Sequence, residues 1–185
     1  MKRAEAIAII ARGSGDALIV CNIGYPCREL AASFDRDENF YMLGSMGLAS
    51  SIGLGLAMTR PERKVMALDG DGSVLMNLGT LSTMACHGPG NYLLIVLDNG
   101  VYGSTGSQPT PICARTDLTR MARAAGIDVV EEARDPGGLR ERLASMGHGV
   151  LVVKVEPGNA DVPVIDLSPP DILRRFMDVA ARPRR

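Results

Sequence analysis

Two short polar segments, each directly after an apolar run, contain the side chains best suited to bind a ligand or a metal ion. Gly70-Asp71-Gly72-Ser73 follows the apolar run 65–68, and Asp98-Asn99-Gly100-Val101 follows the apolar run 92–97. Each run predicts a short buried strand. Because neighbouring strands of an open parallel sheet end at the same edge, where ligands bind, we expect Asp71 and Asn99 to lie at one site.

The residue types in these segments suit a hard cation that holds a phosphate group. Asp71 offers a carboxylate oxygen, Asn99 a neutral amide oxygen, and Val101 a backbone carbonyl. With two phosphate oxygens and one water, these atoms complete an octahedral oxygen set, which favours Mg²⁺. Gly72 and Ser73 would present backbone N–H groups to a diphosphate at the start of a helix.

Length and composition are those of one ordinary globular domain, which we place at residues 1–185. Hydrophobic residues make up 46% of the chain and charged residues 22%, and the net charge is −1. These values argue against nucleic acid or a membrane surface as a partner. No apolar run reaches the roughly 20 residues that span a bilayer. The four cysteines fit no zinc motif, so we expect reduced thiols and a cytoplasmic protein.

Segments of helical and strand character alternate along the chain. Helices are expected over 3–11, 27–32, 48–59, 78–86, 118–125, 137–146 and 171–180. Strands are expected over 17–21, 39–43, 65–68, 92–97, 127–130 and 150–155, with Glu131 and Glu132 in a solvated loop. The alternation predicts an α/β fold with a single doubly wound, mostly parallel sheet and helices on both faces. Glycines inside 48–59 cost helix stability, so we expect a close neighbour there.

The segment Gly70-Asp71-Gly72-Ser73, followed by a helix, a strand and Asn99, resembles the diphosphate motif of thiamine diphosphate enzymes. The resemblance implies thiamine diphosphate as the cofactor, with Mg²⁺ bound by Asp71, Asn99 and the carbonyl of Val101. It also implies the fold of the diphosphate-binding domain of that family.

A second segment, Gly44-Ser45-Met46-Gly47, resembles the other cofactor segment of the same family. There the Gly44 carbonyl and the Met46 backbone would hold the aminopyrimidine ring, and the Met46 side chain would support the bent cofactor. Asn22-Ile23-Gly24 resembles the loop beside the diphosphate. The resemblance therefore implies these cofactor-binding residues: Asn22, Gly24, Gly44, Ser45, Met46, Gly70, Asp71, Gly72, Ser73, Asn99, Val101, Tyr102 and Gly103.

The stretches 44–55, 69–79 and 98–106 resemble the beta subunits of sulfopyruvate decarboxylases, and phosphonopyruvate decarboxylases are similar in the same stretches. The resemblance implies a carboxy-lyase that converts sulfopyruvate to sulfoacetaldehyde and CO₂. Asp98 departs from the wider family, in which many members carry Asn at this position. Because Asp98 precedes the expected ligand Asn99, we expect this departure not to affect metal binding.

No catalytic residue is expected in this chain, because the activating Glu of the family comes from a separate pyrimidine-binding domain. The chain has no room for a second such domain. The resemblance therefore implies an alpha-type partner subunit, a hetero-oligomer and an active site at the interface.

The polar segment 103–111 is a long loop, and such loops are often functional. The anionic end of the 2-oxoacid substrate needs hydrogen-bond donors, which the partner could also supply. Candidates in this chain are Ser104, Thr105 and Gln108, together with Ser107 and Arg115.

Other functions fit parts of the pattern. The chain could belong to a phosphonopyruvate decarboxylase or an acetolactate synthase, or it could be a cofactor-binding module without turnover of its own. A flavodoxin-like domain that binds Mg²⁺ for phosphotransfer is an alternative from another class, but it leaves 44–47 and Asn99 unexplained.

Overall fold

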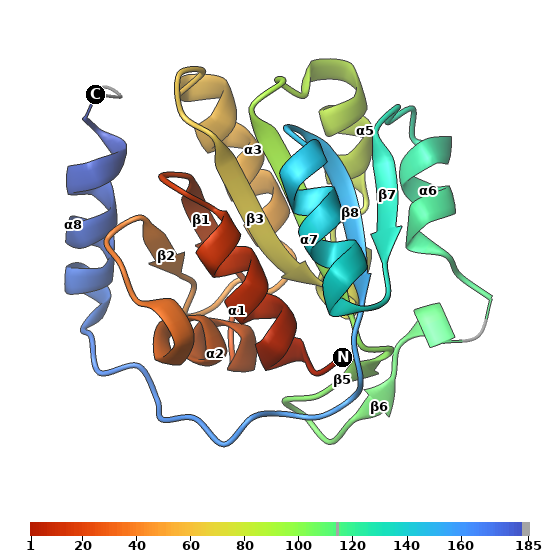
Figure 1. Cartoon of the computed structure of the whole chain (residues 1–185), viewed down its shortest axis with the longest axis horizontal. Coiled ribbons are helices and arrows are strands. Elements are labelled where there is room, and N and C mark those ends of the chain that lie inside the picture. Colours follow the sequence, from red (N-terminus) through yellow and green to blue (C-terminus); the bar gives the residue numbers. More distant parts are fainter. Residues whose placement is uncertain (114, 183–185) are drawn as a thin grey trace.

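The computed structural model describes residues 1–113 and 115–182. Its main sheet has six strands in the order β2-β1-β3-β4-β8-β7 (Figure 1), and each neighbouring pair is parallel. The prediction of a parallel sheet is therefore confirmed. The strands are β1 (Leu18–Cys21), β2 (Asn39–Tyr41), β3 (Val65–Gly70), β4 (Tyr92–Asp98), β7 (Val130–Ala133) and β8 (Gly149–Lys154).

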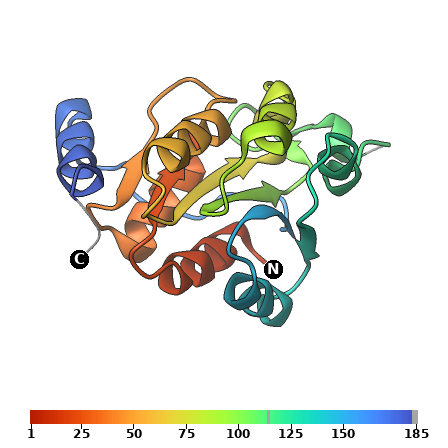
Figure 2. The same cartoon turned by 90° about the horizontal axis from the view of Figure 1, so that it is seen from above.

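Helices cover both faces of this sheet, as predicted. Figure 2 shows α1 and α7 on one side of the strands and α3 and α5 on the other. The first face carries α1 (Arg3–Gly13), α2 (Tyr25–Phe34) and α7 (Pro136–Ser145). The second carries α3 (Ala49–Thr59), α5 (Gly79–His87) and α6 (Leu118–Ala124). The short helix α4 (Asp71–Leu75) follows β3 directly and was not predicted as a separate helix.

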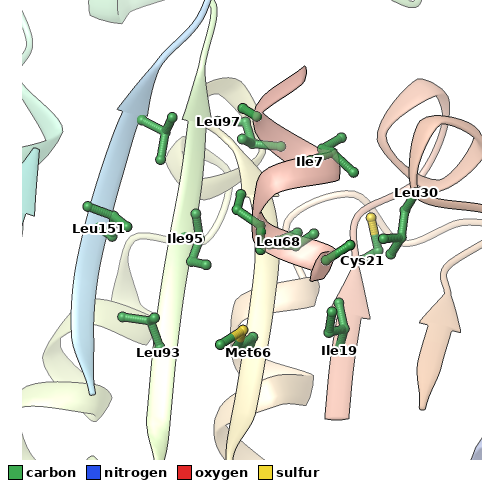
Figure 3. Packing of buried hydrophobic residues seen from close by; sticks show 14 of the residues in the cluster. Ile7, Ile19, Cys21, Leu30, Met66, Leu68, Leu93, Ile95, Leu97 and Leu151 are labelled. Atoms are coloured by element: carbon green, nitrogen blue, oxygen red, sulfur yellow. The ribbon is translucent and has the colours of Figure 1, made fainter. Parts of the chain in front are cut away.

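The two faces of the sheet form separate apolar layers because successive strand residues point to opposite sides. Ile19, Leu68 and Ile95 pack with Ile7 of α1 and Leu30 of α2 (Figure 3), and all five are fully buried. The residues that alternate with them face α3, α5 and α6: Leu18, Ala67, Leu94 and Val96. A central strand buried on both faces needs a continuous apolar run, which explains why 65–68 and 92–97 are apolar throughout.

The glycines of α3 behave differently from one another. A Cβ on Gly53 would lie 3.0 Å from Ala67 of β3 and 3.0 Å from the Tyr92 ring, so this glycine allows the helix to approach the sheet closely. A Cβ on Gly55 would meet no atom within 4 Å. The expected close neighbour is therefore found at Gly53 but not at Gly55.

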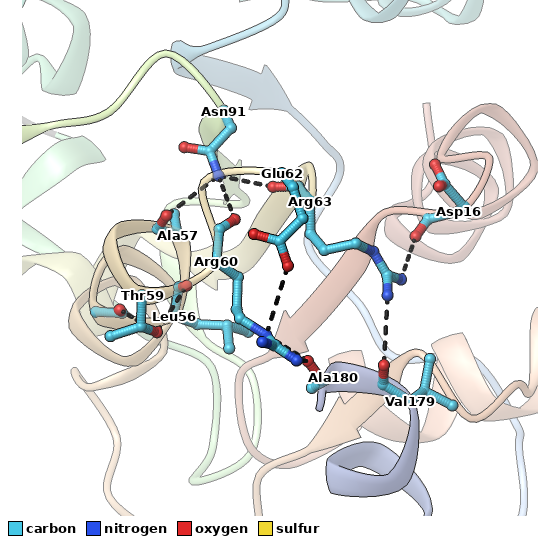
Figure 4. Close-up of polar contacts among 11 residues, drawn as sticks. Asp16, Leu56, Ala57, Thr59, Arg60, Glu62, Arg63, Asn91, Val179 and Ala180 are labelled. Atoms are coloured by element: carbon cyan, nitrogen blue, oxygen red, sulfur yellow. Dashed lines mark hydrogen bonds and ion pairs between the residues drawn. The ribbon is translucent and has the colours of Figure 1, made fainter. Parts of the chain in front are cut away.

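Helix α8 (Pro169–Ala180) lies along the β2 edge of the sheet (Figure 1). Figure 4 shows the contacts of its last turn: Arg63 donates to the Val179 carbonyl at 3.3 Å, and Arg60 donates to the Ala180 carbonyl. Arg63 also donates to the Asp16 carbonyl at 2.9 Å, which connects this turn to the segment before β1. The last carbonyls of a helix have no partner within the helix, so these cations complete its C-terminal end.

The strand expected over 127–130 is displaced in the structure. β7 begins at Val130 and pairs with β8 in the register Val130 to Val150, so Glu131 and Glu132 belong to the edge strand. The expectation of a solvated loop there was wrong. An edge strand has solvent on one side and accepts polar residues, which makes its composition hard to distinguish from a loop.

The carboxyl ends of β1, β3 and β4 meet where the strand order reverses, because β2 and β3 lie on opposite sides of β1. Ligands of open α/β sheets bind at such a point. The loop predicted over 103–111 contains strand β6 (Gln108–Pro109), which pairs antiparallel with β5 (Val101–Tyr102) directly before the loop. The 3₁₀ helix η1 (Pro111–Cys113) follows. The hairpin lies at the same edge (Figure 1).

None of the helices in the described part of the chain is both long enough and apolar enough to cross a bilayer. Cys21, Cys27 and Cys86 are free thiols in the structure, the first two buried and the third exposed.

Candidate functional site

A pocket of about 170 Å³ lies at the carboxyl ends of β1, β3 and β4. It brings together predicted residues that are far apart in the sequence, from Asn22 to Thr105. The predicted substrate residues Ser104 and Thr105 line it. The predicted cofactor residues that line it are Asn22, Met46, Gly70, Asp71, Gly72, Ser73, Asn99, Val101, Tyr102 and Gly103.

Other predicted residues lie outside the pocket wall. Gly24 has a positive φ of 82° and lies beside it, since a Cβ there would be 3.2 Å from Ser104 Oγ. Gly44 and Ser45 are exposed and directly precede Met46. Gln108 is exposed and exchanges two hydrogen bonds of 3.0 Å with Thr105. Two further candidates, Ser107 and Arg115, are exposed and do not line the pocket.

Asp71 begins helix α4 immediately after β3, and its side chain is 2% exposed. Thr110 Oγ1 donates a hydrogen bond of 2.5 Å to Asp71 Oδ2. Burial raises the pKa of Asp71, and the nearby carboxylate of Asp98 raises it further, against the lowering effect of Thr110 and of the Gly72 and Asn99 N–H groups. The groups around Asp71 therefore stabilise the negative charge of its carboxylate only in part.

Asp98 is the second acid in this region and has its own cation. It is 5% exposed and forms an ion pair and hydrogen bond with Lys154, its neighbour across the β4–β8 ladder. The carboxylate of Asp98 is therefore paired with a cation of the protein.

Asn99 lies in a tight turn that follows β4. Its Oδ1 accepts a hydrogen bond of 3.1 Å from the Val101 N–H, and Gly100 adopts a positive φ of 69°. Asn side chains commonly stabilise turns in this way. The carbonyl oxygen has a second lone pair, so this bond leaves Asn99 able to bind a cation.

The two segments that resemble cofactor loops contact each other. Ser73 Oγ accepts a hydrogen bond of 2.9 Å from the Gly47 N–H, and Asn77 Nδ2 donates to the Gly47 carbonyl at 3.1 Å. Gly47 has a φ of 92° and Ser45 a φ of 61°. The segment 44–47 is therefore fixed against α4 in a backbone conformation that favours glycine.

Gly72 makes room for an aromatic ring. A Cβ on Gly72 would lie 2.3 Å from Cε1 of Tyr102, closer than two carbon atoms can approach. Tyr102 lies in β5 and also lines the pocket. The glycine is thus required for the hairpin to pack against the start of α4.

The donor set suits a cation carried by a diphosphate better than a metal bound by protein alone. Across residues 1–113 and 115–182, no three His, Cys, Asp or Glu residues cluster in a way that could hold a metal ion. Among the described residues that form the wall of the pocket, Asp71 is the one carboxylate. A divalent cation there needs further oxygens from Asn99, from the backbone and from phosphate, which is the set expected for Mg²⁺.

Sequence reasoning missed Arg3, which lines the pocket although it is 6% exposed. It donates to both carboxylate oxygens of Glu29 at 2.8 Å and to Asn159 Oδ1 at 2.9 Å. Asn159 donates in turn to the Gly103 carbonyl at 2.9 Å. The available signal was weak: a cation in the first turn of a helix opposes the helix dipole and so needs another reason to be there.

The comparison with known protein families decides between the candidate functions of this site. A profile of thiamine pyrophosphate enzymes, describing their C-terminal TPP binding domain, matches residues 23–155. The chain belongs to this family. Thiamine pyrophosphate is another name for thiamine diphosphate, so the predicted family, the predicted fold and thiamine diphosphate as the cofactor are confirmed, and the flavodoxin-like alternative is set aside.

Two curated relatives are similar over most of the chain. "Sulfopyruvate decarboxylase subunit beta" of Methanothermobacter thermautotrophicus is 49% identical over 96% of this chain and 94% of its own length. "Phosphonopyruvate decarboxylase" of Streptomyces viridochromogenes is 40% identical over 91% of this chain, but over 43% of its own length.

A solved structure shares the fold. A putative thiamin diphosphate-dependent enzyme from Mycobacterium smegmatis superposes with a TM-score of 0.69 at 21% identity. The match covers 84% of this chain and 31% of that chain.

Proposed function

We propose that this chain is the cofactor-binding subunit of a thiamine diphosphate-dependent 2-oxoacid decarboxylase that converts sulfopyruvate to sulfoacetaldehyde and CO₂. The observation that carries the proposal is the pocket in which Asp71, Asn99 and Met46 come together. The identity of 49% to a sulfopyruvate decarboxylase beta subunit, over nearly the full length of both chains, supports the substrate. Residues 1–185 would act as one domain.

In this proposal Asp71, Asn99 and the Val101 carbonyl bind Mg²⁺, and the Gly70–Ser73 turn with Asn22 receives the diphosphate. Their common position in one pocket supports these roles. Thiamine diphosphate supplies the electron sink for the electron pair that CO₂ leaves behind. The protein holds the cofactor in place through two segments that are themselves linked by the Gly47–Ser73 hydrogen bond.

Ser104 and Thr105 are proposed to contact the anionic end of the substrate. Both lie in the hairpin turn and line the pocket, and both carry hydroxyl donors. Gln108 would act through Thr105, which it holds by two hydrogen bonds. Hydroxyl donors serve a sulfonate and a phosphonate equally, so phosphonopyruvate is the second candidate substrate, supported by 40% identity to a phosphonopyruvate decarboxylase.

The partner in this proposal is an alpha-type subunit with a pyrimidine-binding domain and the activating Glu. The chain spans 43% of the length of the Streptomyces phosphonopyruvate decarboxylase, which leaves that relative room for another domain. Four large apolar side chains on segments beside the pocket are 40% exposed or more, and they would be covered by the partner. They are Leu43, Leu48, Ile52 and Met76.

The free thiols of Cys21, Cys27 and Cys86 support a reducing compartment, and we infer the cytoplasm.

Cofactor binding can be tested by thermal denaturation of the chain, with and without the co-expressed partner. Thiamine diphosphate with Mg²⁺ should raise the melting temperature, and EDTA should abolish the rise. A ligand at 100 times its Kd stabilises a protein by ~2.7 kcal/mol. Absence of any shift in the presence of the partner would contradict the proposal. Competitive turnover of sulfopyruvate and phosphonopyruvate by the assembled enzyme would decide the substrate.

A further inference from the structure

The buried hydroxyl of Thr110 is directed at the proposed metal ligand. Thr110 Oγ1 donates a hydrogen bond of 2.5 Å to Asp71 Oδ2, and the two residues are 1% and 2% exposed. They are 39 positions apart in the sequence. Hydrogen bonds to a buried carboxylate are stronger than those between neutral groups, so this contact restricts the orientation of the Asp71 side chain.

Thr110 also contacts the second proposed ligand segment, through its backbone. Its N–H donates to the Gly100 carbonyl at 2.8 Å, directly after Asn99. Val101 pairs with Pro109, so this bond continues the hairpin ladder. Thr110 therefore contacts both the Asp71 carboxylate, through its hydroxyl, and the turn that contains Asn99, through its N–H.

We propose that Thr110 is a positioning residue for the cation of the diphosphate site. The hydroxyl occupies Oδ2 of Asp71 and leaves Oδ1 for the cation, while the N–H holds the turn that carries Asn99 and the Val101 carbonyl. Thr110 itself does not bind the metal. This inference rests on the proposed function, because it assumes that Asp71 and Asn99 are the ligands.

The physical basis is that a metal ligand is effective only in one orientation. Groups that hydrogen-bond to ligands fix that orientation, and their removal typically weakens metal binding ~10–100-fold. The hydroxyl is the part of Thr110 that acts on Asp71. Ser keeps this donor, Val keeps the shape without it, and Ala removes it without adding bulk. The three substitutions therefore separate the hydrogen bond from packing.

The experiment compares Thr110→Val, Thr110→Ala and Thr110→Ser in the protein assembled with its partner. Mn²⁺, observed by electron paramagnetic resonance, serves as the cation in the presence of thiamine diphosphate. We expect Thr110→Val and Thr110→Ala to weaken Mn²⁺ binding ~10–100-fold and Thr110→Ser to stay near wild type. Thr83→Val, on the exposed surface of α5, is the matched control and should bind as wild type does.

Melting temperatures without cofactor distinguish positioning from a merely structural role. If Thr110→Val lowers the melting temperature while the folded protein binds Mn²⁺ as tightly as wild type, the inference is overturned. Should Thr110→Val fail to fold, the same comparison is made with Thr110→Ala. Wild-type protein that binds no cation with thiamine diphosphate would overturn the proposed function as well, whereas equal binding by wild type and Thr110→Ala overturns this inference alone.

Discussion

Asp71 is the residue on which the proposed chemistry depends most. Its carboxylate is buried near the carboxylate of Asp98, and Lys154 compensates Asp98 rather than Asp71. One Thr110 hydrogen bond and backbone N–H groups favour the charged form without neutralising it. A buried carboxylate whose negative charge is only partly stabilised is a candidate for a functional site, because a bound cation would stabilise that charge.

Replacing Asp71 with Asn should abolish cation-dependent cofactor binding while leaving the fold intact. Asn keeps the shape and an acceptor for Thr110 but removes the charge that a divalent cation needs. We expect the loss of Mg²⁺ affinity to exceed the ~10–100-fold effect of losing a group that only orients a ligand. Calorimetric titration with thiamine diphosphate and Mg²⁺ measures this. Asp178→Asn, on the exposed face of α8, is the control, and an equal effect of both changes would refute the role of Asp71.

Asp69 should make the cofactor-free protein less stable as pH rises. It is fully buried, and burial raises its pKa to about 6. Because this value lies above that of an unfolded Asp, the folded state binds the proton more tightly. The free energy of unfolding should therefore fall by about 2 kcal/mol as pH rises from 4 to above 6.

Asp69→Asn removes this titration and provides the comparison. Urea unfolding of wild type and variant between pH 4 and pH 7.5 should show a steeper decline of stability in wild type. Parallel pH dependences would contradict the assignment to Asp69.

Some residues of the site could be predicted from the sequence and some could not. Asp71 and Asn99 were predictable because each follows a strong apolar strand and parallel neighbours end together. Thr110 and Arg3 were not, because their contacts depend on where a returning loop and a remote helix lie. Such contacts leave no period or spacing in the sequence.

Among the elements, the hairpin of β5 and β6 connects the site to the rest of the fold. Gly72→Ala should force Tyr102 away, because the new Cβ would lie 2.3 Å from the ring. We expect weaker thiamine diphosphate binding, measured by calorimetric titration, with the sheet preserved by circular dichroism. Gly55→Ala is the matched control: it meets no atom within 4 Å and should stabilise α3 by about 1 kcal/mol. Unchanged cofactor affinity in Gly72→Ala would show that the Tyr102 position is unimportant.

The buried pair of Arg3 and Glu29 joins α1 to α2 beside the pocket. Arg3→Met leaves the Glu29 carboxylate buried without its cation, which typically costs about 3–5 kcal/mol. The double change of Arg3 and Glu29 to Met should recover most of this stability, because no uncompensated charge remains. Urea unfolding of the single and double variants measures the difference. A cost below about 1 kcal/mol for Arg3→Met would show that the pair is not needed to compensate Glu29.

Predictability also varied among the elements. Central strands with apolar residues on both faces, such as β3 and β4, were predictable from composition. The edge strand β7 was misplaced because Glu131 and Glu132 interrupt its apolar pattern, and only its pairing with β8 fixes its register. The hairpin of β5 and β6 has just two residues in each strand, too few for a periodic signal.

For the whole molecule, the pocket and the apolar surface beside it point to an enzyme completed by another chain. The pocket contains the residues proposed to bind the cofactor, and the acid that activates the cofactor is proposed to come from the partner. Leu43 and Met76, which lie beside the pocket segments, are 62% and 61% exposed. An apolar surface at the edge of an active site is most simply explained by a subunit that covers both.

The most direct test is decarboxylation of sulfopyruvate, measured as CO₂ release with thiamine diphosphate and Mg²⁺, by this chain alone, by the partner alone and by the two together. We expect no turnover by either chain alone and turnover by the assembled pair. Full activity of this chain by itself, or an assembled pair that binds the cofactor yet decarboxylates neither sulfopyruvate nor phosphonopyruvate, would contradict it.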